Sequence, residues 1–217
     1  MDTKPSRQAA YQDKRNVVNK AYLIEPIIRH RIQESVFYKQ YLYLTNEATI
    51  LPIIINHVKY IGGTDSFGKP SEFLCCVLRL LELDPSADII DVYRDQLGYN
   101  EFKYLTAVVL LYIRLCDTSA DVYNKLDRYY QDYRKLRFKL KTPEFDSHHM
   151  AVNYKLTYID EWVDELLLKD RVVDIKLPRL VPRQQLLEKQ LVQPRQFNVD
   201  VDEESSGSGS DYESDSD

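Results

Sequence analysis

The stretch that decides the fold is residues 57–81, which reads HVKYIGGTDSFGKPSEFLCCVLRLL. Its first half holds three of the six glycines of the chain. Its second half repeats apolar residues at the spacing of one helix face, and Pro70, Ser71 and Glu72 are typical of a helix start. We therefore expect a helix through about Glu82. The glycines before it predict a sharp turn that joins two packed helices.

Helical patterns surround this stretch. The sequence predicts further helices at 18–32, 48–58, 87–97, 100–116, 119–133 and 160–169. Thr45 is the expected cap of the second, which Pro52 should disturb, and Pro26 should kink or restart the first. Residues 100–116 give the strongest signal, because they are apolar nearly all round. Such a helix belongs at the centre of a bundle. The residues expected on its main apolar face are Phe102, Leu105, Val108, Val109, Tyr112, Leu115 and Cys116.

A different pattern begins after this helical series. Residues 135–140 alternate charged and apolar side chains, which is typical of a half-buried strand. Residues 143–153 are then an expected loop, and residues 154–158 an expected hairpin partner. The predicted fold is mainly α: a compact multi-helix domain with a short β-hairpin, plus a disordered acidic C-terminal tail. Its expected parts are a flexible N-terminus (1–16), the domain (17–190), and a linker with an acidic, Ser/Gly-rich tail (191–217).

Charge is unevenly placed along the chain. The last twenty residues carry eight acids and no base, so removing them from a net charge of −5 leaves about +3. A basic body with an acidic tail favours work near nucleic acid or charged partners. Three cysteines form no disulfide framework, and no run is apolar enough for a membrane span or a secretory signal. We expect a soluble intracellular protein that does not bind membranes.

Motifs that suggest catalysis do not hold together. Gly63 to Lys69 does not predict a phosphate-binding loop, because Pro70 stands where a magnesium-binding hydroxyl is needed and the Asp65 carboxylate would repel a phosphate. Cys75 and Cys76 are adjacent on a helix and point about 100° apart, so they cannot share a metal. We expect small core residues there, and no catalytic residue, cofactor or metal site in the chain.

Two charged surfaces are candidates for partner binding. The first is the acidic side of the helix at 160–169, formed by Asp160, Glu161, Asp164 and Glu165. The second is the basic part of the basic-aromatic stretch 129–141, formed by Arg134, Lys135, Arg137, Lys139 and Lys141. The alternative for both is an ordinary solvated face. In the tail, Ser210 and Ser214 precede acidic residues and are candidate phosphorylation sites.

Several short segments together carry a family resemblance. They are YIGG at 60–63, PSEFLC at 70–75, FKYL at 102–105, YIRL at 112–115, DYRKL at 132–136, DEWVD at 160–164 and RVVDIKLPRL at 171–180. In this order and spacing the chain resembles the pre-mRNA-splicing factor 38 family over about residues 17–190. Pro52 departs from that pattern, because it interrupts a segment that is usually an unbroken helix in the family.

The resemblance implies a nuclear, non-enzymatic helical scaffold. Such a protein joins the spliceosome with the tri-snRNP and is needed to activate it. The implied partners are a matrin-type zinc-finger splicing protein and a microfibrillar-associated-protein-1-like factor, and the domain on its own is expected to be a monomer. The alternative hypothesis is a direct RNA-binding protein that uses the basic-aromatic stretch 129–141 and the basic segment 171–197.

Overall fold

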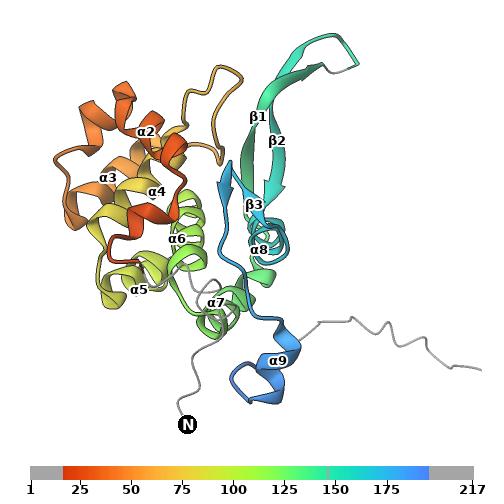
Figure 1. Ribbon diagram of the computed structural model, residues 1–217. Helices are drawn as coiled ribbons and strands as arrows, with labels where there is room; N and C mark the ends of the chain where they lie inside the picture. Colours follow the sequence, from red (N-terminus) through yellow and green to blue (C-terminus); the bar gives the residue numbers. More distant parts are fainter. Residues whose placement is uncertain (1–16, 146, 196–217) are drawn as a thin grey trace, which may run out of the picture.

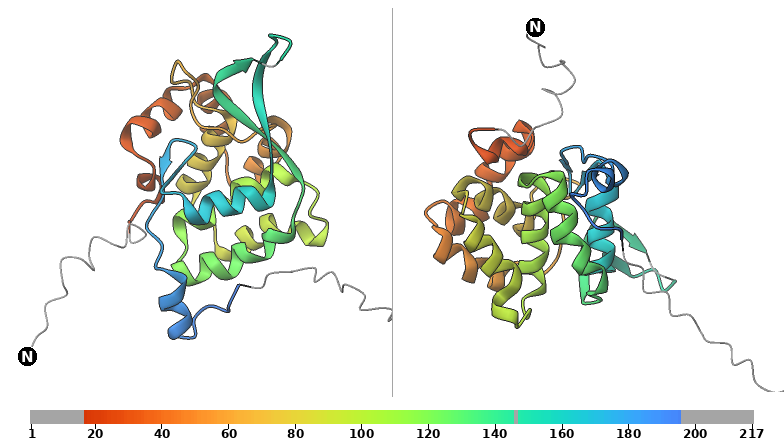
Figure 2. Two further views of the ribbon diagram at one scale, coloured as in Figure 1. Left: turned by 90° about the vertical axis from the view of Figure 1, so that its right-hand side faces the viewer. Right: turned by 90° about the horizontal axis from the view of Figure 1, so that it is seen from below.

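A helical body carries a two-stranded β-hairpin on one side (Figure 1). The structure is a computed structural model, and it describes residues 17–145 and 147–195. Figure 2 shows one helix lying across the body at the foot of the hairpin, where the second strand leads directly into it. The mainly α fold with a short hairpin is confirmed. The predicted disorder of the tail lies outside the described residues.

The elements follow one another in the order of the chain. The helices are α2 (Pro26–Glu34), α3 (Glu47–His57), α4 (Glu72–Leu83), α5 (Ala87–Asp95), α6 (Lys103–Cys116), α7 (Ser119–Leu126), α8 (Ile159–Leu168) and α9 (Arg183–Glu188). One-turn helical segments are η1 (Lys20–Leu23), η2 (Tyr38–Leu42), η3 (Gln96–Gly98) and η4 (Asp127–Gln131). The strands are β1 (Lys135–Phe145), β2 (Ala151–Tyr158), β3 (Arg171–Val172) and β4 (Ile175–Lys176).

The helix α6 forms the centre of the body, as predicted. Every residue from 105 to 115 is buried, and α6 packs against α3, α4, α5, α7 and α8. Phe102 was expected on its apolar face, and that prediction is wrong. Phe102 is the residue before the helix and is 38% exposed, because its backbone is not yet helical and turns the side chain away from the core.

The helices α4 and α8 close the core on either side of α6. Ser71 caps α4, as its sequence predicts, by accepting a hydrogen bond from the Leu74 amide (3.1 Å). Phe73 of α4 meets the ring of Trp162 of α8 edge to face, with ring centroids 5.9 Å apart. Trp162 also donates its indole N–H to the carbonyl of Ala107 in α6 (3.3 Å). One buried indole therefore ties three helices together.

The helix α3 differs from its prediction in two ways. Asn46, not Thr45, is the cap, and it forms a reciprocal capping box with Thr49. Pro52 lies inside a continuous helix and does not interrupt it. A proline removes one backbone hydrogen bond, here the one to the Ala48 carbonyl. The cap and the fully buried Ile50 and Ile54 maintain α3 in spite of that loss.

The paired glycines serve close packing, not the turn that their sequence predicts. Ile61, beside them, pairs with β1 as a short parallel bridge. A Cβ on Gly63 would lie 2.4 Å from the Asp174 carboxylate and 2.9 Å from the Val173 backbone, so a side chain there is excluded. The turn glycine is Gly68, whose φ is +81°.

The hairpin is longer than predicted. β1 and β2 pair antiparallel, and the ladder continues into residues expected to form a loop, with Glu144 opposite Val152. The register shifts between Lys139 and Glu144, where Pro143 lacks a backbone donor. The alternating pattern ends at that irregularity, which is why the outer half of both strands was missed.

Some helix ends also differ from prediction. α5 ends at Asp95, because Gln96 and Leu97 adopt positive φ. The helix expected to reach residue 133 ends at Leu126 and continues only as η4, so Tyr133 is 68% exposed. The short α9 was not predicted at all.

Candidate partner-binding surfaces

Most amides of the glycine-rich loop donate hydrogen bonds within the molecule. The Asp65 side chain accepts from the amides of Phe67 (2.9 Å) and Lys69 (2.8 Å). The Gly68 amide donates to the Asp65 carbonyl (3.0 Å), and the Thr64 amide donates to Asp174 (2.7 Å). A phosphate cradle needs such amides to be free, so this loop is a structural one.

The vicinal thiols are core residues. Cys75 and Cys76 are fully buried in α4. Burial raises the pKa of the Cys75 thiol to about 12 and holds the pKa of Cys76 well above its usual range. A thiol that stays protonated is neither a nucleophile nor a metal ligand. Within 17–145 and 147–195, no three His, Cys, Asp or Glu side chains cluster in a way that would hold a metal ion.

The same described residues contain no helix with the length and apolar character that a membrane crossing requires.

The acidic side chains of α8 are largely engaged within the molecule. Glu161 accepts from Thr157 (2.7 Å), Asp164 accepts from the Tyr130 hydroxyl (3.1 Å), and Glu165 pairs with Lys169 (2.7 Å). Asp160 and Asp164 are half-buried, so the four carboxylates do not form the freely solvated face that the apolar stripe predicts. Their role in partner binding stays a prediction.

The basic stretch divides into two groups. Arg134 and Lys141 are paired with acids: Arg134 with Asp132 (2.6 Å) and Lys141 with Asp174 (3.6 Å). Although burial acts to raise it, the pKa of Asp174 lies below its usual value because Thr64 donates hydrogen bonds to it and Lys141 is near. The other group, Lys135, Arg137 and Lys139, lies along β1.

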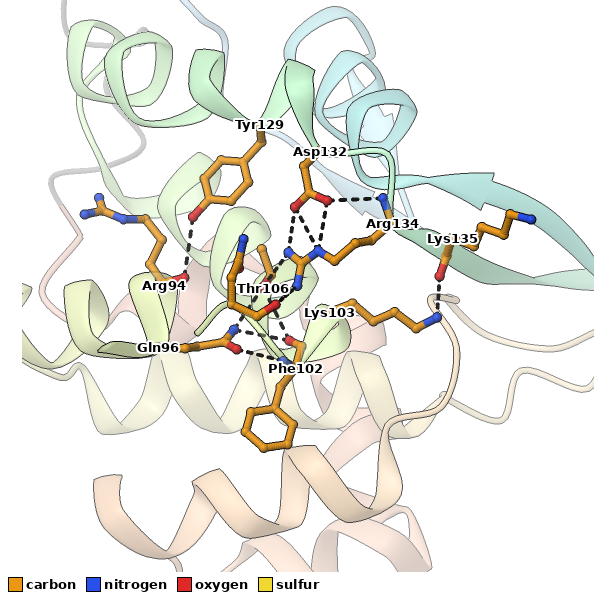
Figure 3. Close-up of polar contacts among 10 residues, drawn as sticks. Arg94, Gln96, Phe102, Lys103, Thr106, Tyr129, Asp132, Arg134 and Lys135 are labelled. Carbon is orange, nitrogen blue, oxygen red and sulfur yellow. Dashed lines mark hydrogen bonds and ion pairs between the residues drawn. The ribbon is translucent and has the colours of Figure 1, made fainter. Parts of the chain in front are cut away.

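Arg134 is the centre of a polar network that fixes the start of the hairpin (Figure 3). Its Nε lies 2.9 and 3.0 Å from the two carboxylate oxygens of Asp132. Its Nη2 donates to Thr106 of α6 (3.2 Å), and its Nη1 donates to the carbonyl of Asn100. The arginine therefore joins the η4–β1 connection to α6 and to the loop at 96–100.

That loop is held in an unusual conformation. Gln96, Leu97 and Asn100 all have positive φ (47°, 55° and 49°), although none is a glycine. The left-handed region costs an L-residue roughly 1–2 kcal/mol. The Gln96 amide offsets part of this cost by accepting from the Phe102 amide (2.7 Å) and donating to Thr106 (3.0 Å). Strain that is fixed in this way is typical of a functional segment.

The loop exposes apolar side chains beside a groove. Leu97 is 80% exposed and Tyr99 is 83% exposed. They lie at the rim of a cavity of about 260 Å³ between α3, α5 and the start of α6. Its lining is apolar apart from two residues: Leu51, Ile55, Val92, Tyr93, Gln96, Leu97, Tyr99, Glu101, Phe102 and Leu105. We call this the apolar groove.

Sequence patterns did not reveal the apolar groove. Leu97 ends the helix predicted over 87–97, and Phe102 lies on the apolar face predicted for 100–116, so the sequence places both within helices. Their exposure depends on the positive φ of three non-glycine residues. The identities of these residues do not predict that backbone conformation. The local sequence feature that marks this segment is Gly98 followed by Tyr99, in a short connection between two predicted helices.

Comparisons with known proteins show what the chain is similar to. A family model described as the PRP38 family matches residues 13–190. The chain is 38% identical over 189 residues to pre-mRNA-splicing factor 38A of Danio rerio, covering 85% of this chain and 56% of that protein. For the Homo sapiens protein the identity is 36% over 186 residues, covering 85% and 55%. The chain thus spans about half the length of these curated relatives.

A solved structure agrees with the sequence comparisons. A chain in the crystal structure of the Snu23–Prp38–MFAP1(217–258) complex of Chaetomium thermophilum superposes with a TM-score of 0.75 and 38% identity. The match covers 85% of this chain and 90% of that chain. The two chains are therefore similar in sequence as well as in fold.

Proposed function

Because the chain belongs to the PRP38 family, we propose that it is a non-enzymatic scaffold protein of the spliceosome. It joins with the tri-snRNP, contributes to activation, and acts in the nucleus. The observation that carries the proposal is the match to most of a chain that was crystallised in a Snu23–Prp38–MFAP1 complex. The described residues also present an apolar groove with the exposed side chains of Leu97 and Tyr99 beside it, which is typical of a protein-binding surface.

Two kinds of partner follow from that complex: a zinc-finger splicing protein that resembles Snu23, and a factor that resembles MFAP1. The MFAP1 in the complex is only a segment, residues 217–258. Short segments commonly bind a folded domain by laying the apolar side of an amphipathic helix into a groove. We assign the MFAP1-like segment to the apolar groove of this chain.

The construction of the apolar groove supports this assignment. Leu97 and Tyr99 are the kind of exposed apolar side chains that are usually covered in a complex. Their loop is fixed by Gln96 and Arg134 before any partner arrives. Binding then requires little additional ordering of the groove, which favours affinity.

Calorimetric titration of the full chain with an MFAP1-like segment, equivalent to residues 217–258 of the Chaetomium protein, tests the proposal. The informative variant is Leu97→Gly, which removes an exposed side chain and suits the left-handed backbone. Affinity should fall by about 10-fold, as when a large apolar side chain that contacts the partner is removed. Stability should not fall, because the strain at residue 97 is relieved.

The matched control is Leu168→Ala, which removes an exposed leucine of α8. It should leave affinity unchanged. Equal binding by wild type and Leu97→Gly would exclude the apolar groove. Absence of binding by the wild type would contradict the scaffold function itself.

A further inference from the structure

One face of the hairpin places three cations of β1 opposite two tyrosines and a leucine of β2. Residues directly opposite each other on paired strands lie on the same face. The register places Lys135 opposite Tyr158, Arg137 opposite Leu156, and Lys139 opposite Tyr154. We call the face formed by these six residues the basic-aromatic face. The opposite face of β1 carries the fully buried Leu136 and the half-buried Phe138, so it is the face that packs on the body.

A third segment widens this face. The Ile61 amide donates to the Arg137 carbonyl (2.8 Å), and the Lys139 amide donates to the Ile61 carbonyl (2.8 Å). This parallel pairing places Tyr60 alongside β1, and the Lys139 ammonium lies 5.1 Å from the centre of the Tyr60 ring. The Tyr60 and Tyr154 rings are 5.4 Å apart. A row of ring, cation and ring thus crosses three neighbouring segments.

The cations of this face are available to a ligand. Among the described residues, no acid forms an ion pair with Lys135, Arg137 or Lys139, unlike Arg134 and Lys141. Lys135 and Arg137 are exposed. Lys103 of α6 adds a further positive charge at the foot of the hairpin, where its Nζ donates to the Lys135 carbonyl (2.5 Å; Figure 3).

From this arrangement we propose that the basic-aromatic face binds single-stranded RNA. Every second residue of β1 presents a cation, at a spacing of about 7 Å along an extended strand, to the phosphates. The Tyr154 ring, 41% exposed, stacks on a base, and Leu156, 52% exposed, contacts a neighbouring base or ribose. This function goes beyond the scaffold role and does not depend on it.

The tyrosine rings of the basic-aromatic face favour RNA over an acidic peptide as its ligand. A carboxylate-rich segment would use the cations alone and leave the tyrosines without a role. Unpaired bases use both, because every base has a flat face that stacks on an aromatic side chain. Paired bases in a duplex are already stacked and do not offer those faces. Single-stranded RNA therefore uses more of this surface than either alternative.

Fluorescence anisotropy with a labelled 12-nucleotide oligouridine tests the proposal on the full chain. Wild type should bind at low salt, with an affinity that falls as salt rises. The triple variant Lys135→Ala, Arg137→Ala, Lys139→Ala should bind at least about 10-fold more weakly. Its salt slope should be smaller by about 2, since three phosphate contacts are lost at roughly 0.7 each.

Two further variants separate stacking from charge. Tyr154→Ser should weaken binding by about 10-fold, within the range of one lost base stack, while Tyr154→Phe should retain it. The matched control is Lys155→Ala, which removes an exposed lysine from the other face of the same strand. It should change affinity by less than about twofold, since non-specific charge effects are small for one residue.

The proposal would be overturned by no binding of oligouridine by the wild type at low salt, by an equal loss of affinity in Lys155→Ala, or by equal affinity for polyglutamate. The last would identify an acidic protein segment as the ligand. Equal binding of an RNA duplex would also contradict it. None of these results bears on the titration with the MFAP1-like segment, so the two proposals fail independently.

Discussion

Arg134 acts by holding three segments together. Its guanidinium is mostly buried, with 25% of the side chain exposed, and it bonds Asp132, Thr106 and the Asn100 carbonyl. The planar fork of arginine bonds a carboxylate and a second acceptor at once, which lysine cannot do. Partner binding by Arg134 stays a prediction. In the structure its guanidinium is engaged by contacts within the molecule.

Removal of this side chain should destabilise the fold. Arg134→Ala leaves the Asp132 carboxylate, 12% exposed, without its cation. We expect the free energy of unfolding to fall by about 2–3 kcal/mol, as for lost hydrogen bonds to a charged group. Urea denaturation measures it. The adjacent Lys135→Ala, at an exposed position, should cost less than about 0.5 kcal/mol. Equal costs for the two variants would refute the role assigned to Arg134.

The buried thiols predict a pH dependence. Burial raises the pKa of Cys75 to about 12, from an ordinary value of 9.0. The folded state therefore keeps a proton that the unfolded state releases above about pH 9. The stabilisation is fully present below pH 9 and is lost as pH rises toward 12.

The measurement is urea denaturation at a series of pH values from 8 to 11. One such group lowers the free energy of unfolding by at most about 1.4 kcal/mol per pH unit in this window. Cys75→Ala should therefore show a shallower decline than wild type. If the free energy of unfolding fell equally steeply with pH in wild type and in Cys75→Ala, burial would not raise the pKa of Cys75.

At the scale of elements, α3 contains Pro52, whose energetic cost is offset by the Asn46 cap and by the buried Ile50 and Ile54. Pro52→Ala restores a donor to the Ala48 carbonyl and relieves a steric clash. We expect thermal unfolding to show a gain of about 1–3 kcal/mol, since proline inside a helix costs about 3. Pro26→Ala is the control, because Pro26 stands at the first position of α2 where no donor is needed. A gain for Pro26→Ala alone would contradict this account.

The sequence predicted the elements whose patterns are local. α4, α6 and α8 followed from apolar spacing, and the inner half of the hairpin from alternation. The charged candidates were placed on the right elements, but their pairings were not visible. Which cation meets an acid, as Arg134 meets Asp132, depends on how the chain turns at one residue. The apolar groove depends on backbone angles and not on residue types, so it emerged only from the structure.

At the scale of the whole molecule, the acidic tail and the basic-aromatic face have opposite charge. The tail lies outside the described residues, and so do Ser210 and Ser214. Their phosphorylation stays a prediction, and it would add roughly two negative charges at each site. We expect a tail that competes with RNA for the cations of β1.

Deletion of residues 198–217 should therefore raise oligouridine affinity at low salt, and phosphorylation should lower it. Both effects should fade at high salt, because screening weakens contacts between exposed charges. Anisotropy titrations of the full chain, the phosphorylated chain and the deletion variant measure these differences in affinity. An unchanged affinity after deletion would show that the tail does not reach the face, while the RNA site itself would stand on the β1 variants.

The proposed scaffold function requires that a preformed apolar groove binds a partner segment. Hydrogen–deuterium exchange with and without the MFAP1-like segment measures where that segment binds. We expect new protection of amides within residues 92–103, and no such protection in Leu97→Gly. Protection confined to α8 or to the hairpin, or equal protection in Leu97→Gly, would contradict it.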